Sequence, residues 1–295
     1  MKHLRLPLLL AVVLLAAGCD TSFEAFEETD LAYSVFGYLD AAADTQFVRV
    51  EPVQDSTFVG SSGDIGARVT STNLTTGETV VWEEGVFRLG PDDSLRVHTF
   101  TTTADLAPET TYRFTVEREE GGATSVAEVT LPPAFPPPAI RNAPDRREGS
   151  EEEGQTGAIT LLVDGVERLG SVRADYEYEA CFPVPDNPPE CSRQQAVAYH
   201  LADTTRRPDG TLEIEIPWQQ DIPRQVGATL QTFYSFRVTV AAASEDWPDY
   251  AADNPPGSGP EGQPLPPPRV GTNVEGGTGF LGGAFTRTVD VPILR

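Results

Sequence analysis

The sequence predicts an all-β protein built of two β-rich domains. Apolar and polar residues alternate with the period of a strand in many short stretches, of which Leu212-Glu-Ile-Glu-Ile216 is the clearest. Gly, Pro, Asn and Asp gather between these stretches, as turns require. A proline-rich segment at 132–138 divides the chain into two series of such stretches.

The N-terminal segment predicts export and lipidation. Lys2 and Arg5 accompany an apolar run, Leu6–Ala17, which is followed by Gly18 and Cys19. This run of about twelve residues is shorter than the roughly twenty that a membrane-spanning helix needs. We therefore expect residues 1–18 to be a cleaved lipoprotein signal peptide and Cys19 to carry the lipid. The alternative is an ordinary signal peptide with a cysteine that follows the cleavage site by chance.

Residues 19–30 are predicted to form an acidic tether. Acidic residues stand there among small ones, at Asp20, Glu24, Glu27, Glu28 and Asp30. An extended chain advances about 3.3 Å per residue, so a dozen residues reach roughly 40 Å. The tether would hold the first domain away from the lipid.

Residues 31–131 are predicted to form the first domain. Leu106, Tyr112, Phe114 and Val116 share one parity and therefore one face of a strand. This stretch resembles the penultimate strand of immunoglobulin-like and fibronectin type III sandwiches, in which a tyrosine pins the preceding corner. We therefore expect an Ig-like β-sandwich. Its other strands are predicted at Tyr33–Leu39, Gln46–Val53, Arg68–Asn73, Glu78–Trp82 and Thr124–Leu131, with a hairpin turn at Leu74–Gly77.

The segment 132–138 is predicted to be a stiff linker, and 139–295 a second β-rich domain. Charged and Pro/Gly-rich loops are expected at 141–157 and 254–268. Between them the alternation places apolar residues on one side of two strands, at Val172, Ala174, Tyr176, Tyr178, Ala180 and Phe182 and at Tyr234, Phe236, Val238 and Val240.

Cys181 and Cys191 are predicted to form a disulfide. They enclose a proline-rich loop of an exported chain, where oxidation is favoured. Zinc is the weaker alternative, because a structural site needs four ligands and no histidine or third cysteine is close in sequence. A Cys-x-x-Cys redox pair is excluded by the spacing.

The sequence predicts no catalytic, cofactor or metal site. Gly277-Thr-Gly279-Phe-Leu-Gly282 matches the dinucleotide fingerprint, but a strand rather than a helix is expected after it. His98 and His200 lie in separate predicted domains, on strand-like stretches where surface or half-buried positions are expected. Carboxylates are too numerous to single out a pair. Three tryptophans are candidates for the core or for ligand stacking, namely Trp82, Trp218 and Trp247.

The charge narrows the choice of partner. The formal net charge is −24, which makes nucleic acid an unsuitable ligand. A membrane contact through the lipid, an outer-membrane transporter, or a surface glycan or peptide ligand are the partners we expect.

The order of several motifs resembles Bacteroidota-type outer-membrane lipoproteins of the family catalogued as domain of unknown function 4249. The motifs are the lipobox cysteine, Val35-Phe-Gly-Tyr-Leu39, Tyr112-x-Phe114-x-Val116, Leu131-Pro-Pro133, Ser244–Tyr250 and Thr272–Gly282. A long Pro/Gly insertion before the last motif, and Leu281 where an aromatic residue is more usual, depart from the pattern. The resemblance implies an outer-membrane lipoprotein, often associated with TonB-dependent transport, without established activity. It also implies that Asn273 and the glycines form a tight connection that leads into the last strand.

We therefore expect a lipid-anchored cell-envelope protein with a non-enzymatic binding role, either beside an outer-membrane transporter or alone. Either the periplasmic or the surface-exposed leaflet of the outer membrane is compatible with these observations. The alternative is a surface carbohydrate-active or other hydrolase that uses an Asp/Glu pair.

Overall fold

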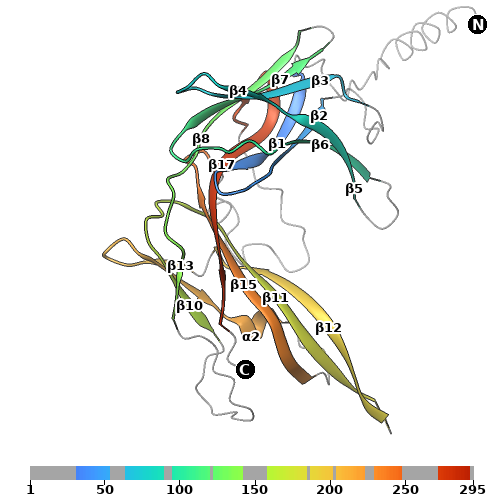
Figure 1. Cartoon of the computed structure of the whole chain (residues 1–295), viewed down its shortest axis with the longest axis vertical. Helices are drawn as coiled ribbons and strands as arrows, with labels where there is room; N and C mark the ends of the chain where they lie inside the picture. The colour runs from blue at the N-terminus through green and yellow to red at the C-terminus, as the bar shows by residue number, and fades with distance from the viewer. Residues whose placement is uncertain are drawn as a thin grey trace, which may run out of the picture. The chain divides into compact units, whose positions relative to one another are not determined.

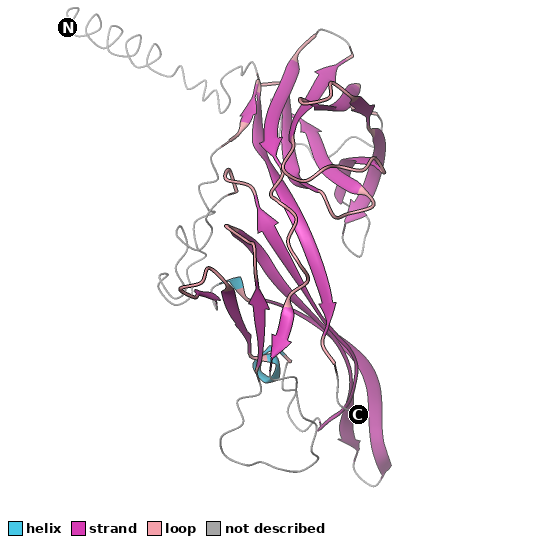
Figure 2. Ribbon diagram, turned by 60° about the vertical axis from the view of Figure 1, so that its left-hand side comes forward, coloured by secondary structure: helices cyan, strands magenta, loops and turns pink. Residues whose placement is uncertain are grey.

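The computed structural model describes residues 31–53, 64–89, 95–119, 122–141, 158–184, 187–201, 204–222, 229–247 and 272–292. The chain is all-β, as the sequence predicts, and these residues include the short helix α2 (Trp218–Asp221) among many strands (Figure 2). Within them, no helix has the length and apolar character that a membrane span needs. The signal peptide, Cys19, the tether, nearly all of 141–157 and the loop 254–268 lie outside the described residues.

Seventeen strands are described, and they form three sheets. The first eight are β1 (Tyr33–Asp40), β2 (Gln46–Pro52), β3 (Ala67–Asn73), β4 (Thr79–Val81), β5 (Glu83–Leu89), β6 (Leu95–Thr102), β7 (Thr111–Arg118) and β8 (Thr124–Thr130). The others are β9 (Ala139–Arg141), β10 (Ile159–Val163), β11 (Leu169–Val184), β12 (Asn187–Tyr199), β13 (Thr204–Arg206), β14 (Leu212–Ile216), β15 (Thr229–Ala243), β16 (Val274–Glu275) and β17 (Gly277–Asp290).

An eight-stranded sheet runs through both halves of the chain. Its order is β12-β11-β15-β17-β1-β2-β6-β5. The C-terminal strand β17 pairs in parallel with β1 and antiparallel with β15, so it joins the two halves (Figure 1). The other sheets have five strands, β16-β8-β7-β3-β4, and four strands, β13-β14-β10-β9.

Two hydrophobic cores pack against the same face of the eight-stranded sheet. The N-terminal core lies between this sheet and the five-stranded one and includes Val35, Val48, Phe100, Phe114, Val129 and Leu281. The C-terminal core lies between it and the four-stranded sheet and includes Leu161, Val172, Tyr176, Ile214, Val238 and Phe285. Leu281 and Phe285 share one parity of β17 but belong to different cores. The sequence predicts that all of 139–295 forms one domain. In the structure, β16 and the start of β17 instead belong to the N-terminal core.

The predicted tyrosine corner is present. Tyr112 is buried at the start of β7, and its hydroxyl oxygen accepts a hydrogen bond from the backbone N–H of Ala107 at 2.9 Å. This contact holds the chain that enters β7. Phe114 and Val116 are buried on the same side of the strand, as the alternation predicts.

We expect Tyr112→Phe to lower the free energy of unfolding by about 1 kcal/mol, because only the hydroxyl of a buried hydrogen bond is lost. Urea denaturation followed by fluorescence measures the change. Tyr199→Phe is the matched control, because Tyr199 is exposed, and its midpoint should be nearly unchanged. Equal midpoints for both variants would show that the corner adds no stability.

The glycine motif of β17 is explained by close backbone packing. Gly279 has φ +106°, and a Cβ there would lie 2.1 Å from the carbonyl oxygen of Val35 in the paired strand. Asn273 bridges the same region, because its side chain donates to the carbonyl of Leu281 at 2.8 Å and accepts from the N–H of Leu281 at 3.0 Å. The segment is a strand, as predicted, and it has the tight connection that the resemblance implies.

Two expectations for the second half of the chain need correction. Tyr234 is exposed although Phe236, Val238 and Val240 are buried. The register between β11 and β15 shifts beside Tyr234, and this irregularity breaks the predicted parity. The proline-rich segment is also more than a spacer, because Phe135 is buried in the C-terminal core with its ring 5.6 Å from that of Phe285.

The predicted disulfide is confirmed. Cys181 and Cys191 are bonded and are directly opposite each other in the β11–β12 pair. The bond therefore cross-links two hydrogen-bonded strands, close to the end of β11 and the start of β12.

Candidate binding face

Aromatic side chains gather on the outer face of the eight-stranded sheet, which is the face opposite both cores. Phe36 and Tyr38 on β1 and Phe47 on β2 are 48%, 49% and 52% exposed. Tyr38 is the direct neighbour of Phe47 in the β1–β2 pair, and Phe36 is the direct neighbour of Phe280 in the β1–β17 pair. Alternation along β1 explains the placement, because Tyr33, Val35 and Leu39 occupy the core side.

Trp247 extends this surface. Its ring lies 5.7 Å from that of Tyr38 and 5.9 Å from that of Phe280. A Cβ at Gly282 would lie 2.7 Å from the indole carbon Cε3, so the glycine leaves the space that the indole occupies. We call Phe36, Tyr38, Phe47, Trp247 and the buried Phe280 the aromatic face.

The segment that carries Trp247 is fixed by polar contacts. The Ser244 N–H donates to the carbonyl of Gly283 at 2.9 Å, and the Ser244 hydroxyl accepts from the Gly283 N–H at 3.0 Å. The Arg168 guanidinium donates to the carbonyls of Glu245 and Trp247. The turn at 244–247 is therefore attached to the sheet, and Trp247 has a defined position.

We expect Gly282→Ala to displace the Trp247 indole, because the new methyl group would overlap it. The measurement is acrylamide quenching of tryptophan fluorescence, which should increase, and the increase should be absent when Trp247→Phe is also present. Gly85→Ala is the matched control on the same sheet, since its Cβ would meet only the Thr99 carbonyl at 3.6 Å. Unchanged quenching in Gly282→Ala would contradict the packing.

Charged pairs accompany the rings on the outer face. On β2, the Arg49 Nε and a Glu51 carboxylate oxygen are 3.4 Å apart. On β11, an Arg173 guanidinium nitrogen and an Asp175 carboxylate oxygen are 2.6 Å apart. The pKa of the Tyr38 phenol is raised, mainly by burial and then by Asp40, while Arg173 acts in the opposite direction. The outer face therefore combines apolar rings with positively charged hydrogen-bond donors and negatively charged hydrogen-bond acceptors.

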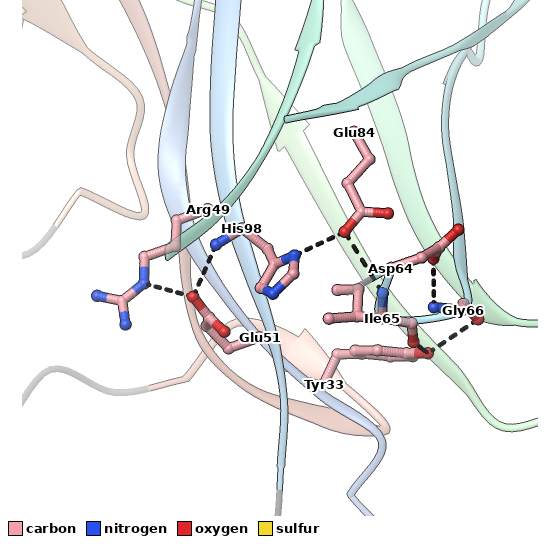
Figure 3. Close-up of polar contacts among 8 residues, drawn as sticks. All are labelled: Tyr33, Arg49, Glu51, Asp64, Ile65, Gly66, Glu84 and His98. Carbon is pink, nitrogen blue, oxygen red and sulfur yellow. Dashed lines mark hydrogen bonds and ion pairs between the residues drawn. The ribbon is translucent and has the colours of Figure 1, made fainter. Parts of the chain in front are cut away.

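A polar cluster lies beside Arg49 and Glu51 (Figure 3). The His98 Nδ1 and a Glu84 carboxylate oxygen are 2.6 Å apart, and the same oxygen accepts from the Ile65 N–H at 3.4 Å. A Glu51 oxygen accepts from the His98 backbone N–H at 3.0 Å. The Tyr33 hydroxyl donates towards the carbonyls of Ile65 and Gly66. The cluster joins β1, β2, β5 and β6 to the chain at 64–66.

A second buried cluster lies beside the C-terminal core. The His200 Nε2 is 2.8 Å from an Asp221 carboxylate oxygen, which also accepts a hydrogen bond from the Tyr176 hydroxyl. Burial, and then this bond with Asp221, raise the pKa of Tyr176, so the phenol stays protonated at neutral pH. The surface or half-buried placement expected for His98 and His200 is wrong, because both are buried beside a carboxylate from another element.

The other two tryptophans, Asp164 and the disulfide contact neighbouring residues of the fold. Trp82 is buried in the N-terminal core and donates to the Ser71 hydroxyl at 3.0 Å, and Trp218 packs half-buried against the C-terminal core. Asp164 accepts from the Thr211 hydroxyl at 2.6 Å. The sulfurs of the disulfide and a Glu179 oxygen lie within 4.8 Å of one another. Thiolates rather than a disulfide bind metals, so this group is not a metal site in the oxidised protein.

Among the residues that the structure describes, three carboxyl groups have lowered pKa values. Hydrogen bonds from Arg193, from Thr211 and from Arg207 are the main causes at Glu177, Asp209 and Glu213 respectively. A general acid would need the opposite shift.

The Glu213–Arg207 pair, with an N–O distance of 2.6 Å, predicts a pH dependence of stability. Because the folded-state pKa of Glu213 is lowered, its contribution is present above the ordinary value of about 4.3 and is lost as the pH falls through the folded-state pKa. Glu213→Gln should therefore lower the urea midpoint at pH 7, and the difference from wild type should shrink below about pH 4. Glu119→Gln is an exposed control. A difference that grows on acidification would contradict the sign.

No protein-family model matches this chain, and no curated protein matches it. The resemblance to the lipoprotein family therefore stays a prediction. The fold and the aromatic face define an all-β protein whose best candidate site is an open sheet surface.

Proposed function

We propose that this chain is a lipid-anchored, non-enzymatic protein of the cell envelope that binds a partner or ligand through the aromatic face. The observation that carries the proposal is the group of half-exposed rings of Phe36, Tyr38 and Phe47 on neighbouring strands beside Trp247. Scattered single apolar residues are ordinary on protein surfaces, but a contiguous aromatic group is typical of binding sites.

The construction of the face favours binding. Its residues lie on paired strands or, in the case of Trp247, on a turn pinned to them. Rings held in this way lose little conformational freedom when a partner binds. The anchoring part of the proposal rests on the sequence, namely on the apolar run that ends at Cys19 and on the acidic tether.

Membrane fractionation tests the anchor. The full-length protein should sediment with membranes and be released by detergent, and Cys19→Ser should appear in the soluble fraction. Recovery of wild type and Cys19→Ser in the same soluble fraction would contradict lipidation at Cys19.

Affinity purification from detergent-solubilised membranes tests the binding role, and an outer-membrane transporter is the protein partner that the family resemblance suggests. We expect Phe36→Ala/Tyr38→Ala/Phe47→Ala to lose the material that wild type retains, whether protein or glycan. Val81→Ala is the control, because Val81 is an exposed apolar residue on the five-stranded sheet. Identical retained material in the triple variant and wild type would count against the aromatic face.

A further inference from the structure

We infer that the aromatic face binds a neutral glycan. This inference rests on the proposed function and names its ligand class. Sugar rings present apolar C–H surfaces and hydroxyl groups together, so a protein site for them needs exposed aromatic rings next to polar side chains.

The rings provide an apolar surface. Tyr38 and Phe47 are direct neighbours across two strands, and Phe36 lies two residues along β1 from Tyr38. Successive residues on one face of a strand are about 6.6 to 6.8 Å apart. The exposed rings therefore lie at regular intervals along β1 and across to β2, and an extended chain of sugar rings can lie over them.

Polar groups of the same face lie next to these rings. Arg49 and Thr101 are the register neighbours of Phe36 and Phe47, and Arg49 also neighbours Thr99 on β6. Arg49 and Glu51 form an ion pair, so a donor and an acceptor are held together beside the rings. Hydroxyl groups both donate and accept, and a paired guanidinium and carboxylate satisfy both roles.

The charge of the protein favours a neutral glycan over the other possible ligands. The whole chain carries −24, so an acidic polymer is repelled. Arg49 is paired with Glu51 and Arg173 with Asp175, so neither guanidinium is left to attract an acidic ligand. A neutral ligand with many hydroxyl groups is complementary to this surface. Aromatic residues and Arg are enriched in the core of a protein–protein interface, whereas Glu and Asp are depleted there. The Glu51 carboxylate beside the rings is therefore the feature that favours a glycan over a protein.

The test is affinity electrophoresis of the purified full-length protein in native gels that contain one polysaccharide each. The neutral probes are hydroxyethyl cellulose, xylan, galactomannan and dextran, and polygalacturonate is the acidic comparison. We expect retardation by at least one neutral probe and none by polygalacturonate. Tyr38→Ala and Phe47→Ala should each weaken that retardation about tenfold in dissociation constant, which is typical for the loss of an aromatic anchor. Val81→Ala should behave as wild type.

The outcomes separate this inference from the proposed function. Absence of retardation by all four neutral probes, or retardation that Tyr38→Ala and Phe47→Ala leave unchanged, would overturn the glycan assignment. If the triple variant then still loses a protein partner from solubilised membranes, the binding role stands with a protein ligand instead. Circular dichroism of each variant shows whether the fold is retained, and Tyr38→Phe, which keeps the ring, should keep most of the binding.

Discussion

Gly279→Ala should lower the free energy of unfolding by about 4 kcal/mol or more, or prevent folding. A side chain at φ +106° is strained, which costs of order 1–3 kcal/mol. In addition the new Cβ would lie 2.1 Å from the Val35 carbonyl oxygen, so β17 and β1 would have to separate. Losses of this size are exceptional for a single substitution and arise where backbone approach itself is blocked. Urea denaturation, or soluble yield where the variant does not fold, measures the effect.

Gly122→Ala is the matched control. Gly122 also has positive φ, at +69°, but a Cβ there would meet nothing within 4 Å. Its substitution should cost about 1 kcal/mol, the backbone term alone. Equal losses in the two variants would mean that the close approach of β17 to β1 contributes nothing, and that would contradict the parallel pairing.

Close packing also explains why the glycine spacing of the dinucleotide fingerprint occurs in a strand. A Cβ at Gly277 would lie 2.5 Å from the Tyr33 carbonyl oxygen, and one at Gly282 would meet the Trp247 indole. Each of the three glycines of the motif is thus required by a neighbour in the fold. The spacing arises from packing rather than from phosphate binding.

Much of the local structure could be predicted from the sequence because a strand with one buried face must alternate. The alternation predicts that the sets of residues that include Phe114, Val172 and Ile214 are buried, and all three residues are buried. The tyrosine corner was also predictable, because Tyr112 has a characteristic position at the start of its strand.

Pairing between distant strands could not be read in the same way. Alternation says which side of β17 faces a core, but it does not say that the strand pairs with β1, more than two hundred residues earlier. The buried histidines were missed for a related reason. His98 and His200 each depend on a carboxylate from another element, Glu84 on β5 and Asp221 on α2.

The aromatic face did have a signal in the sequence. Phe36 and Tyr38 stand at the positions of β1 that alternate with buried Tyr33, Val35 and Leu39. Apolar residues at both parities of a strand predict that both of its faces are covered or used. The registers with Phe47 and Phe280 and the position of Trp247 required the structure.

The second large effect is expected at Asp221, the carboxylate that links His200 to Tyr176. Asp221→Ala should lower the free energy of unfolding by about 3 kcal/mol, because a buried imidazole and a buried phenol both lose this acceptor. Asp209→Ala, an exposed carboxylate on the turn before β14, is the control and should have a much smaller effect. Urea denaturation at pH 7 measures both.

A double-mutant cycle with Tyr176→Phe shows whether the cluster is structural. In wild type, Tyr176→Phe should cost about 1 kcal/mol, because the hydroxyl leaves its acceptor. In Asp221→Ala the same change should be neutral or stabilising, since it removes a buried hydroxyl that has lost its partner. A catalytic carboxylate behaves in the opposite way, because groups held for chemistry usually lower stability and their removal raises it. If Asp221→Ala stabilises the protein, the cluster is not structural and the hydrolase alternative gains its first support. If it destabilises with the expected coupling, His200, Asp221 and Tyr176 stabilise the sheet, and the aromatic face remains the site to which binding experiments should be directed.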